Sequence, residues 1–158
     1  MHPNETVIEA FYSAFQKRDA PAMNACYDAK AEFSDPVFQN LKGQHVGAMW
    51  RMLCERGKDL KIEFSGIHAD EFSGKVHWEA EYTFSATGRK VHNKINAVFE
   101  FRNGKIVAHR DVFDLWKWTR MALGVKGWIL GWTPLVQNVI RKQAAKSLKQ
   151  FMEHENIS

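Results

Sequence analysis

Residues 31–50, AEFSDPVFQNLKGQHVGAMW, contain the pattern from which we infer both the fold and the candidate site of this chain. A short alternating run ends at Pro36, which cannot donate a hydrogen bond to a strand ladder. Asp35 therefore lies at a strand end, and the parity that turns Phe33 toward a core turns Asp35 there as well. An apolar enclosure disfavours the charged carboxylate, raises its pKa and makes it a better proton acceptor. The pattern predicts that Asp35 is a general base.

The same residues have a second, purely structural interpretation. An Asp-Pro pair such as Asp35 and Pro36 commonly starts a turn, in which the carboxylate accepts hydrogen bonds from the backbone that follows. The spacing alone leaves both interpretations open.

The length and composition of the chain predict one compact domain with a substantial core. The chain has 158 residues, of which 45% are hydrophobic, and this fraction is well above that of disordered segments. No stretch reaches the roughly 18 apolar residues of a membrane span, and the acidic, amphipathic N-terminus lacks the features of a secretory signal. We therefore expect a soluble protein of the cytoplasm.

Metal and cofactor sites have no recognisable signal in the sequence. Cys26 and Cys54 lie in helical patterns with apolar neighbours, so we expect buried small hydrophobes rather than a disulfide or a zinc site. The seven histidines show no metal-ligand spacing, and no glycine-rich phosphate loop occurs. The sequence predicts neither a metal nor a cofactor.

The net charge of +4 is unevenly distributed along the chain. Residues 116–152 contain no acidic side chain and seven basic ones: Lys117, Arg120, Lys126, Arg141, Lys142, Lys146 and Lys149. The remainder of the chain is therefore acidic on balance. Because the basic residues are confined to one segment and no recognition motif occurs, we expect no nucleic-acid partner.

The first part of the chain has helical periodicity. A helix is predicted over about residues 4–18, capped by Asn4 or Thr6, and its apolar stripe is Val7, Ile8, Phe11, Tyr12 and Phe15. Tyr12 either offers its hydroxyl to a ligand or is a core residue whose hydroxyl is satisfied locally.

Two more helices are predicted before the sheet. A short one starts at the Asp19 cap and runs to about Tyr27. Another follows Gly43, and its buried face includes Val46, Met49, Trp50 and Leu53. Trp50 is most simply a core residue.

From Leu60 onward the hydrophobic period changes from helical to two. The alternating segments are residues 60–64, 76–84, 91–101 and 107–113. Asn103 and Gly104 form a strong signal for a type I′ hairpin turn. These segments predict an antiparallel meander with its large side chains on one face.

Two titratable residues occupy core-facing positions on the last of these strands. By parity, Val107, His109, Asp111 and Phe113 share one side. An unpaired buried charge is costly, so we expect a pocket beside His109 and Asp111. The alternatives are a bulge that turns both residues to solvent, or a purely structural His-Asp pair.

The segment after Leu115 is rich in tryptophan, with Trp116, Trp118, Trp128 and Trp132. A helix start at Thr133-Pro134 leads into an apolar stripe that comprises Leu135, Val136, Val139, Ile140, Ala144, Leu148, Phe151 and Met152. Such a stripe packs either on the body of the protein or on a second subunit. Since basic residues lie opposite, it also fits a helix on an anionic membrane surface.

Residues 5–115 resemble the nuclear transport factor two-like superfamily, and most closely its SnoaL-like and ketosteroid isomerase-like branches. The resemblance implies an α+β, cystatin-like fold, in which a cone-shaped, curved and mostly antiparallel sheet wraps around N-terminal helices and encloses an apolar pocket. We expect a SnoaL-like cone domain at residues 1–115 and a basic helical extension, packed on that domain, at residues 116–158.

The resemblance also implies roles for individual residues. Residues 27–36, YDAKAEFSDP, resemble the isomerase segment in which the aspartate before proline is the general base, here Asp35. His109 and Asp111 lie where SnoaL-like cyclases and limonene epoxide hydrolase-like proteins place acid/base aspartates. Phe11 and Ala97 occupy the positions of the isomerase's two oxyanion donors, so that oxyanion hole is absent. The expected pocket lining is Tyr12, Phe15, Phe33, Trp50, Trp78, Tyr82, Asn93, Ala97, Phe99 and Phe113.

Three kinds of function are compatible with these patterns. The first is an enzyme of isomerase, cyclase or hydrolase type that performs acid/base chemistry on a small hydrophobic molecule. The second is a non-catalytic module that binds an apolar ligand, with or without attachment to a membrane surface through the basic tail. The third is a structural dimer. Members of the superfamily commonly pair through the outer face of the sheet, where Thr83, Val98 and Val112 interrupt charged residues, so we expect a homodimer.

Overall fold

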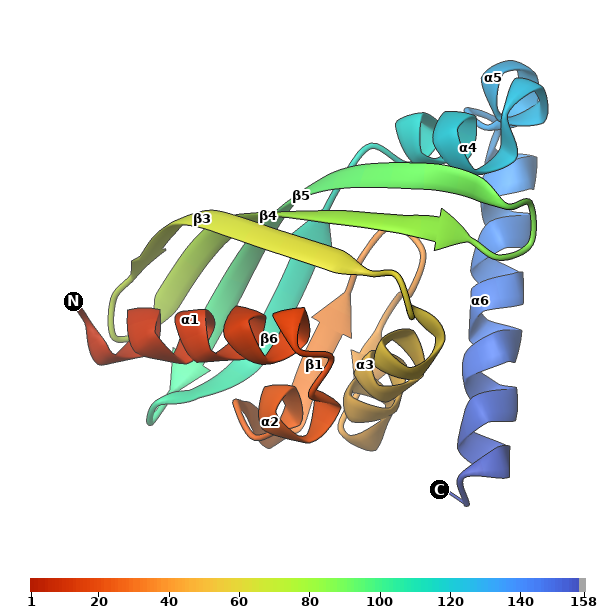
Figure 1. The fold of residues 1–158 in the computed structure, drawn as a ribbon. Helices are drawn as coiled ribbons and strands as arrows, with labels where there is room; N and C mark the ends of the chain where they lie inside the picture. Colours follow the sequence, from red (N-terminus) through yellow and green to blue (C-terminus); the bar gives the residue numbers. More distant parts are fainter. Residues whose placement is uncertain (157–158) are drawn as a thin grey trace.

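A six-stranded mixed sheet forms the frame of the molecule (Figure 1). The computed structural model describes residues 1–156, so the last two residues of the predicted extension lie outside it. The strands are β1 (Tyr27–Ser34), β2 (Leu41–Lys42), β3 (Lys61–Ala69), β4 (Ser73–Phe84), β5 (Arg89–Arg102) and β6 (Lys105–Val112). Their spatial order is β2-β1-β6-β5-β4-β3, and all neighbours are antiparallel except β1 and β6.

The predicted meander and its tight turn are confirmed. β3, β4, β5 and β6 follow one another in sequence and in space. Asn103 and Gly104 have φ angles of 53° and 77°, and a type I′ turn requires positive φ at both central residues. The hairpin therefore fixes the register between β5 and β6.

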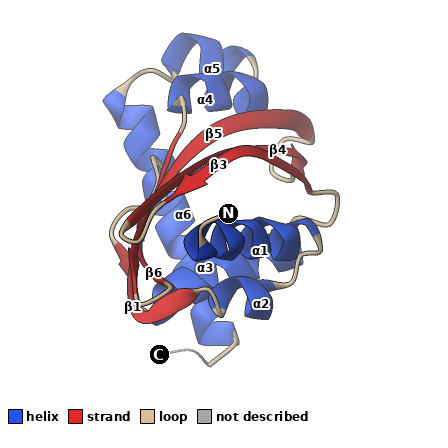
Figure 2. Cartoon of the chain, turned by 90° about the vertical axis from the view of Figure 1, so that its left-hand side faces the viewer, coloured by secondary structure: helices blue, strands red, loops and turns tan. Residues whose placement is uncertain are grey.

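Three helices fill the inner side of the curved sheet (Figure 2). They are α1 (Pro3–Gln16), α2 (Ala20–Asn24) and α3 (Gln44–Arg56). Among the largest fully buried side chains are Tyr12 and Phe11 from α1, Phe33 from β1 and Trp50 from α3. The predicted α+β class, with a curved sheet around N-terminal helices, is confirmed.

The ends of the first two helices differ from the prediction. His2, rather than Asn4 or Thr6, caps α1, because its ring accepts from the Asn4 backbone N–H while Glu5 reaches back to the His2 N–H. Helix α2 has the predicted Asp19 cap, but it ends at Asn24. It stops early because Tyr27 already pairs with β6 as the first residue of β1.

The C-terminal segment folds into α4 (Leu115–Leu123), α5 (Val125–Leu130) and α6 (Pro134–His154). Helix α6 runs beside α3 (Figure 1), and its Leu148, Phe151 and Met152 belong to the main apolar core. The first part of its predicted stripe is uncovered, since Leu135 and Val139 are exposed. Within residues 1–156, no helix is both long and apolar enough to cross a bilayer.

Candidate active site

A chain of hydrogen bonds runs through the core and is centred on His109 of β6. Its Nδ1 lies 2.7 Å from the Tyr27 hydroxyl, and its Nε2 lies 2.9 Å from Oδ1 of Asp111. The Trp50 indole N–H donates to the Tyr27 hydroxyl at 2.9 Å, and the Trp78 indole N–H donates to Asp111 Oδ1 at 3.3 Å. Side chains from α3, β1, β4 and β6 thus meet in one buried network.

The donors and acceptors of this network agree with one tautomer of His109. Because the Tyr27 hydroxyl accepts from Trp50, its own proton is free to donate to Nδ1 of His109. The imidazole proton then resides on Nε2 and donates to Asp111. Both ring nitrogens are satisfied inside the protein, so His109 orients the Asp111 carboxylate and has no free nitrogen for a ligand.

The parity predicted for β6 is confirmed at His109 and Asp111, but at the start of the strand Ile106 and not Val107 is fully buried, because the β5–β6 register shifts there. His109 and Asp111 are buried, whereas Arg110 and Val112 are exposed on the opposite face. No bulge turns the pair to solvent, because the β5–β6 register is regular from Ala97 to Phe99, opposite these residues. The contacts just described are those of a structural His-Asp pair, and they fix the direction in which the Asp111 carboxylate points.

Asp35 combines the two interpretations of its sequence context. Its Oδ1 accepts from the backbone N–H groups of Val37 at 2.7 Å and Phe38 at 2.5 Å, so it does form a turn. Burial, and after it the negative charge of Asp111, raise the pKa of Asp35 from 3.8 to about 7, although the two backbone hydrogen bonds act in the opposite direction. Near neutral pH this carboxyl group is able both to take up and to release a proton.

The sheet register brings Asp35 and Asp111 to the same side. β1 and β6 run parallel, with Phe33 opposite His109 and Ser34 opposite Arg110. Asp35 is the first residue after β1, and Asp111 follows Arg110 in β6. The negative charge of Asp111 disfavours ionisation of Asp35, which explains why Asp111 raises the pKa of Asp35. A hollow of about 540 Å³ includes both aspartates in its lining.

Two tyrosine hydroxyls are electrostatically coupled to these carboxyl groups. Burial, together with the charge of Asp111, places the pKa of Tyr12 well above its usual value, and the Tyr12 hydroxyl has no hydrogen-bond partner among the described residues. The Tyr82 hydroxyl accepts from the Trp118 indole N–H at 2.7 Å. Burial raises the pKa of Tyr82, and the Asp35 carboxylate adds to that effect. Tyr12 is therefore the one of the two with an unused buried donor.

The other residues predicted to line a pocket belong to the same interior. Phe15 packs against Trp50 and Trp78, with ring centroids 5.2 and 5.5 Å apart. Phe33, Asn93, Ala97 and Phe99 are buried as well, and Tyr82 and Phe113 are half-buried. In this structure the aromatic rings fill much of the space between α1 and the sheet by packing on one another.

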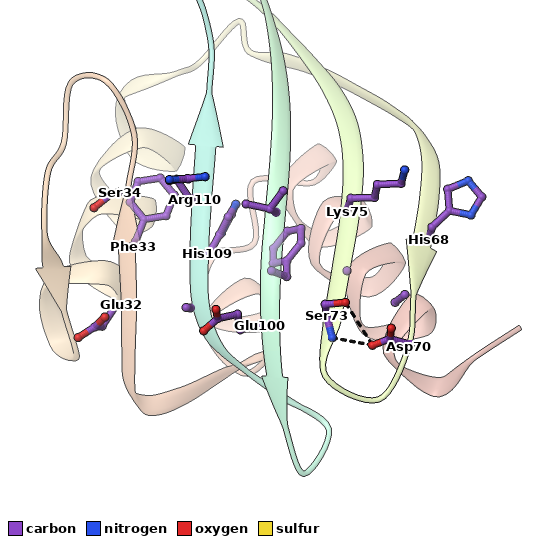
Figure 3. Close-up of a pocket in the computed structure, with 15 residues that line it drawn as sticks. Glu32, Phe33, Ser34, His68, Asp70, Ser73, Lys75, Glu100, His109 and Arg110 are labelled. Carbon is purple, nitrogen blue, oxygen red and sulfur yellow. Dashed lines mark hydrogen bonds between the residues drawn. The ribbon is translucent and has the colours of Figure 1, made fainter.

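A larger hollow of about 830 Å³ lies across the sheet, and Figure 3 shows its lining. Its labelled side chains include Glu32 and Ser34 of β1, Arg110 of β6, Glu100 of β5 and Lys75 of β4 (Figure 3). These polar and charged groups stand on the face opposite to His109 and Asp111. This hollow is therefore a different site from the smaller hollow that includes Asp35 and Asp111.

Sequence reasoning missed two residues that complete the site. Tyr27 was assigned to the end of a helix, yet it is the hydroxyl that pairs with His109. Its alternation with Ala29, Ala31 and Phe33 is the signal that identifies a longer strand. Trp118 was treated only as part of the tail, and its link to Tyr82 spans 36 positions in sequence, which no local pattern encodes.

Within residues 1–156, no group of three or more His, Cys, Asp or Glu side chains is arranged to hold a metal ion. The candidate site therefore consists of carboxyl, hydroxyl, imidazole and indole groups. Such a site is suited to proton transfer and hydrogen bonding.

Comparison with known families agrees with this description. The family model for the SnoaL-like domain matches residues 8–109, so the chain belongs to the SnoaL-like family. The match begins within α1 at Ile8 and ends within β6 at His109, so it includes β1 to β5 and the first part of β6. No curated protein sequence matches the chain significantly.

Solved structures with a similar fold are numerous. An NTF2-like protein of unknown function from Burkholderia pseudomallei shares 20% identity over 77% of this chain and 98% of its own, with a TM-score of 0.66. An LEH-like epoxide hydrolase from M. tuberculosis shares 22% sequence identity over 85% of this chain and 95% of its own, with a TM-score of 0.60. A protein from Jannaschia sp. CCS1, predicted to be a SnoaL-like polyketide cyclase, shares 11% sequence identity over 78% of this chain and 92% of its own, with a TM-score of 0.68. At these identities the likeness establishes the fold alone.

Proposed function

We propose that this protein is an enzyme that performs general acid/base chemistry on a small hydrophobic molecule, with Asp35 as the proton-transferring group. The observation that carries the proposal is that Asp35, at the end of β1, and Asp111, in the adjacent parallel strand β6, line one hollow, and that Asp35 has a pKa of about 7. A carboxyl that titrates near neutral pH is suited to act as base in one step and as acid in the next.

The two aspartates have different environments and hence different roles. Asp111 Oδ1 accepts hydrogen bonds from the His109 Nε2–H and the Trp78 indole N–H, so the orientation of its carboxyl group is fixed. Among the described residues, the Asp35 carboxyl group has hydrogen-bond partners at Oδ1 only, in the turn that follows β1. Its other oxygen is available to a substrate proton or to a water molecule.

The surroundings of the two aspartates differ on their two sides. The described lining of the hollow that includes Asp35 and Asp111 is mostly polar or charged and contains no aromatic side chain. The core beside Asp111 is aromatic, and the buried Tyr12 hydroxyl in it is a donor without a partner among the described residues. A carbonyl or epoxide oxygen would satisfy that donor while Asp35 acts on a neighbouring atom. The epoxide hydrolase and the predicted cyclase among the structural neighbours fit this class of substrate.

Two probe compounds test the proposal directly. One is an apolar cyclic ketone, whose α-hydrogen exchange in D2O is followed by NMR; the other is an apolar cyclic epoxide, whose diol product is measured. Loss of the proton acceptor in Asp35→Asn should lower turnover at least about 100-fold, the usual contribution of a general base. Glu32→Gln is the matched control, since it removes an exposed carboxylate from β1, three residues before Asp35.

A titration of the Asp35 carboxyl carbon by NMR checks the proposal without a substrate. We expect a midpoint near pH 7, and a lower midpoint in a variant in which Asp111→Asn removes the neighbouring charge. A midpoint below about 4.5 in the parent protein would contradict the role of Asp35.

Binding without catalysis is the second candidate function. The observation in its favour is that both ring nitrogens of His109 are hydrogen-bonded to protein side chains, and that one carboxyl oxygen of Asp35 accepts hydrogen bonds within a turn. In that case the same two probes would quench or shift tryptophan fluorescence without turnover, and Asp35→Asn would bind them as well as the parent does.

We also infer a homodimer formed through the outer face of the sheet. Val98 and Val112 are 43% and 51% exposed there. They lie diagonally across the β5–β6 ladder, because Val98 is opposite Arg110 and Val112 is opposite Asn96. A cytoplasmic location stays a prediction of the sequence.

A further inference from the structure

The largest group of exposed apolar side chains lies at one end of the molecule, on α5 and the first turns of α6. This tip surface consists of Val125, Trp128, Ile129, Leu130, Trp132, Leu135 and Val139, whose exposed fractions range from 48% to 76%. Figure 1 shows α5 projecting beyond the sheet, on the opposite side of it from α1 and α2. Seven large side chains this exposed present several hundred Å² of apolar surface, more than scattered surface residues account for.

The tip surface has a fixed shape. Helix α5 packs tightly against α4, since a Cβ atom at Gly127 or Gly131 would collide with Thr119. The guanidinium of Arg120 lies 4.4 Å from the Trp116 ring centroid and 4.8 Å from that of Trp128. The exposed rings are therefore presented by a packed helical hairpin, which needs no further ordering before it binds a partner.

The segment that carries this surface has charges of one sign. No acidic residue occurs between Trp116 and Met152. Lys117 lies on α4, Lys126 on α5, and Lys142 is exposed on α6 one turn after Val139. A second copy of the chain docked on this surface would bring the same positive charges together. An anionic partner meets no such repulsion.

The combination of residues specifies the kind of anionic partner. Tryptophan is enriched where a protein meets the boundary between lipid headgroups and acyl chains, and exposed leucine, isoleucine and valine enter the acyl region. Lysine near such a surface is attracted by acidic headgroups. We propose that the tip surface docks on the surface of a lipid bilayer that contains anionic lipids, with α5 lying in the interfacial plane. This inference does not depend on the proposed enzymatic function.

The test uses the full chain and two kinds of vesicle, one of phosphatidylcholine alone and one with 30% phosphatidylserine. We expect flotation with the anionic vesicles, a blue shift of tryptophan emission, and weakening of binding as salt is raised. The paired change Trp128→Ser with Trp132→Ser should reduce the partition coefficient at least tenfold. The paired change Lys126→Gln with Lys142→Gln should also reduce it on the order of tenfold, and only on anionic vesicles.

Two control variants show whether the effect belongs to this surface. Phe72→Ser removes an equally exposed aromatic ring at the β3–β4 turn, and Lys75→Gln removes an exposed lysine from the sheet. Both should bind vesicles as the parent does. Because all changed residues are exposed, melting temperatures should stay close to the parent value.

Three results would overturn the proposal. One is the absence of parent binding to anionic vesicles at low salt. Another is equal loss of binding in the control and tip-surface variants. The third is a shift from dimer to monomer in Trp128→Ser with Trp132→Ser, since this would assign the surface to a second copy of the chain.

Discussion

At the scale of single residues, Asp35 shows that a turn-forming aspartate and a titratable aspartate are not exclusive. One carboxyl oxygen holds the backbone of the turn, while burial and Asp111 act on the ionisation of the group. The backbone hydrogen bonds lower the pKa of Asp35, whereas burial and the charge of Asp111 raise it, and burial has the largest effect. Substitutions that separate the two roles therefore give opposite changes in stability.

We predict that Asp35→Asn makes the protein less sensitive to pH. In the unfolded chain Asp35 ionises near pH 3.8, and in the folded protein near pH 7. The folded state therefore holds the proton more tightly, and the parent protein loses about 2 to 4 kcal/mol of stability as pH rises between these values. Asparagine keeps the turn acceptor but does not ionise. Chemical denaturation at pH 5 and pH 8 should show the variant as stable as the parent or more so at pH 8, with the advantage reduced at pH 5.

Asp35→Ala is the matched comparison, because alanine removes the turn acceptor as well. Two backbone N–H groups then lose their partner, which costs roughly 1–3 kcal/mol at acidic pH, where the parent carboxyl is neutral. If Asp35→Asn were clearly destabilised at pH 8, ionised Asp35 would be a stabilising group and not a strained base.

We predict that Tyr12→Phe leaves stability unchanged or raises it by up to about 1 kcal/mol, since it removes a buried hydroxyl that has no partner among the described residues. The same change should weaken binding or turnover of the ketone and epoxide probes by roughly tenfold, if this hydroxyl donates to the substrate oxygen. Thermal melts and probe kinetics on one preparation measure both. Tyr82→Phe serves as control, because its hydroxyl is already engaged by Trp118.

Much of the residue-level site follows from strand parity. The alternation predicted that His109 and Asp111 face inward, and the structure confirms this, whereas a register shift at the start of β6 buries Ile106 in place of Val107. The partners of these residues were beyond reach, because Tyr27 and Trp78 come from distant strands. A local pattern states which way a side chain points, and the register between distant strands decides what it meets there.

At the scale of elements, α6 has two halves with different surroundings. Its C-terminal half places Phe151 and Met152 in the main core beside α3, whereas Leu135 and Val139 near its start are exposed. The apolar stripe in the sequence is continuous over both halves, so periodicity alone could not tell which half packs on the body of the protein and which half is left for another partner. The part of α6 that packs beside α3 is covered, and the part near its start is not.

We predict that Phe151→Ala destabilises the protein by about 3–5 kcal/mol, because it leaves a cavity in the core between α3 and α6. Val139→Ala is the matched control on the same helix and should change stability by less than about 0.5 kcal/mol. Urea denaturation of the two variants makes the comparison. Equal effects would show that α6 does not stabilise the body of the protein.

Element boundaries were predicted best where the chain carries explicit turn chemistry. The Asn103-Gly104 turn and the Asp19 and Thr133 caps lie where the sequence placed them. The start of β1 was missed, because Asp28 and Lys30 interrupt the apolar pattern and the alternation of Tyr27 with Ala29 and Ala31 was assigned to the end of a helix instead.

At the scale of the whole molecule, the fold was predictable and the assembly remains a prediction. We expect a homodimer with Val98 and Val112 in its interface, so that Val98→Glu together with Val112→Glu should yield monomers. Sedimentation velocity at tens of micromolar checks this, with Phe72→Glu as the control at another exposed apolar position. A parent protein that sediments as a monomer would contradict the expectation.

The fold was easier to infer than the site for a physical reason. Helical and two-residue periodicities recur over whole elements, so many positions such as Val91, Ile95 and Phe99 give the same answer. The site depends on single contacts, such as that between Tyr27 and His109, and each is specified only once. Redundant signals survive a wrong boundary, and single contacts do not.

The parallel pairing of β1 with β6 also implies an order of events in folding. Tyr27 and His109 are 82 residues apart in sequence, whereas the hairpins of the meander close over a few residues. Contacts between such distant segments form late, because closing a long loop costs chain entropy before any contact compensates for it. In a folding intermediate in which β1 and β6 are not yet paired, Asp35 would lie in water and its pKa would be close to its usual value of 3.8. The proton affinity of the Asp35 carboxyl group would then report when β1 docks on β6.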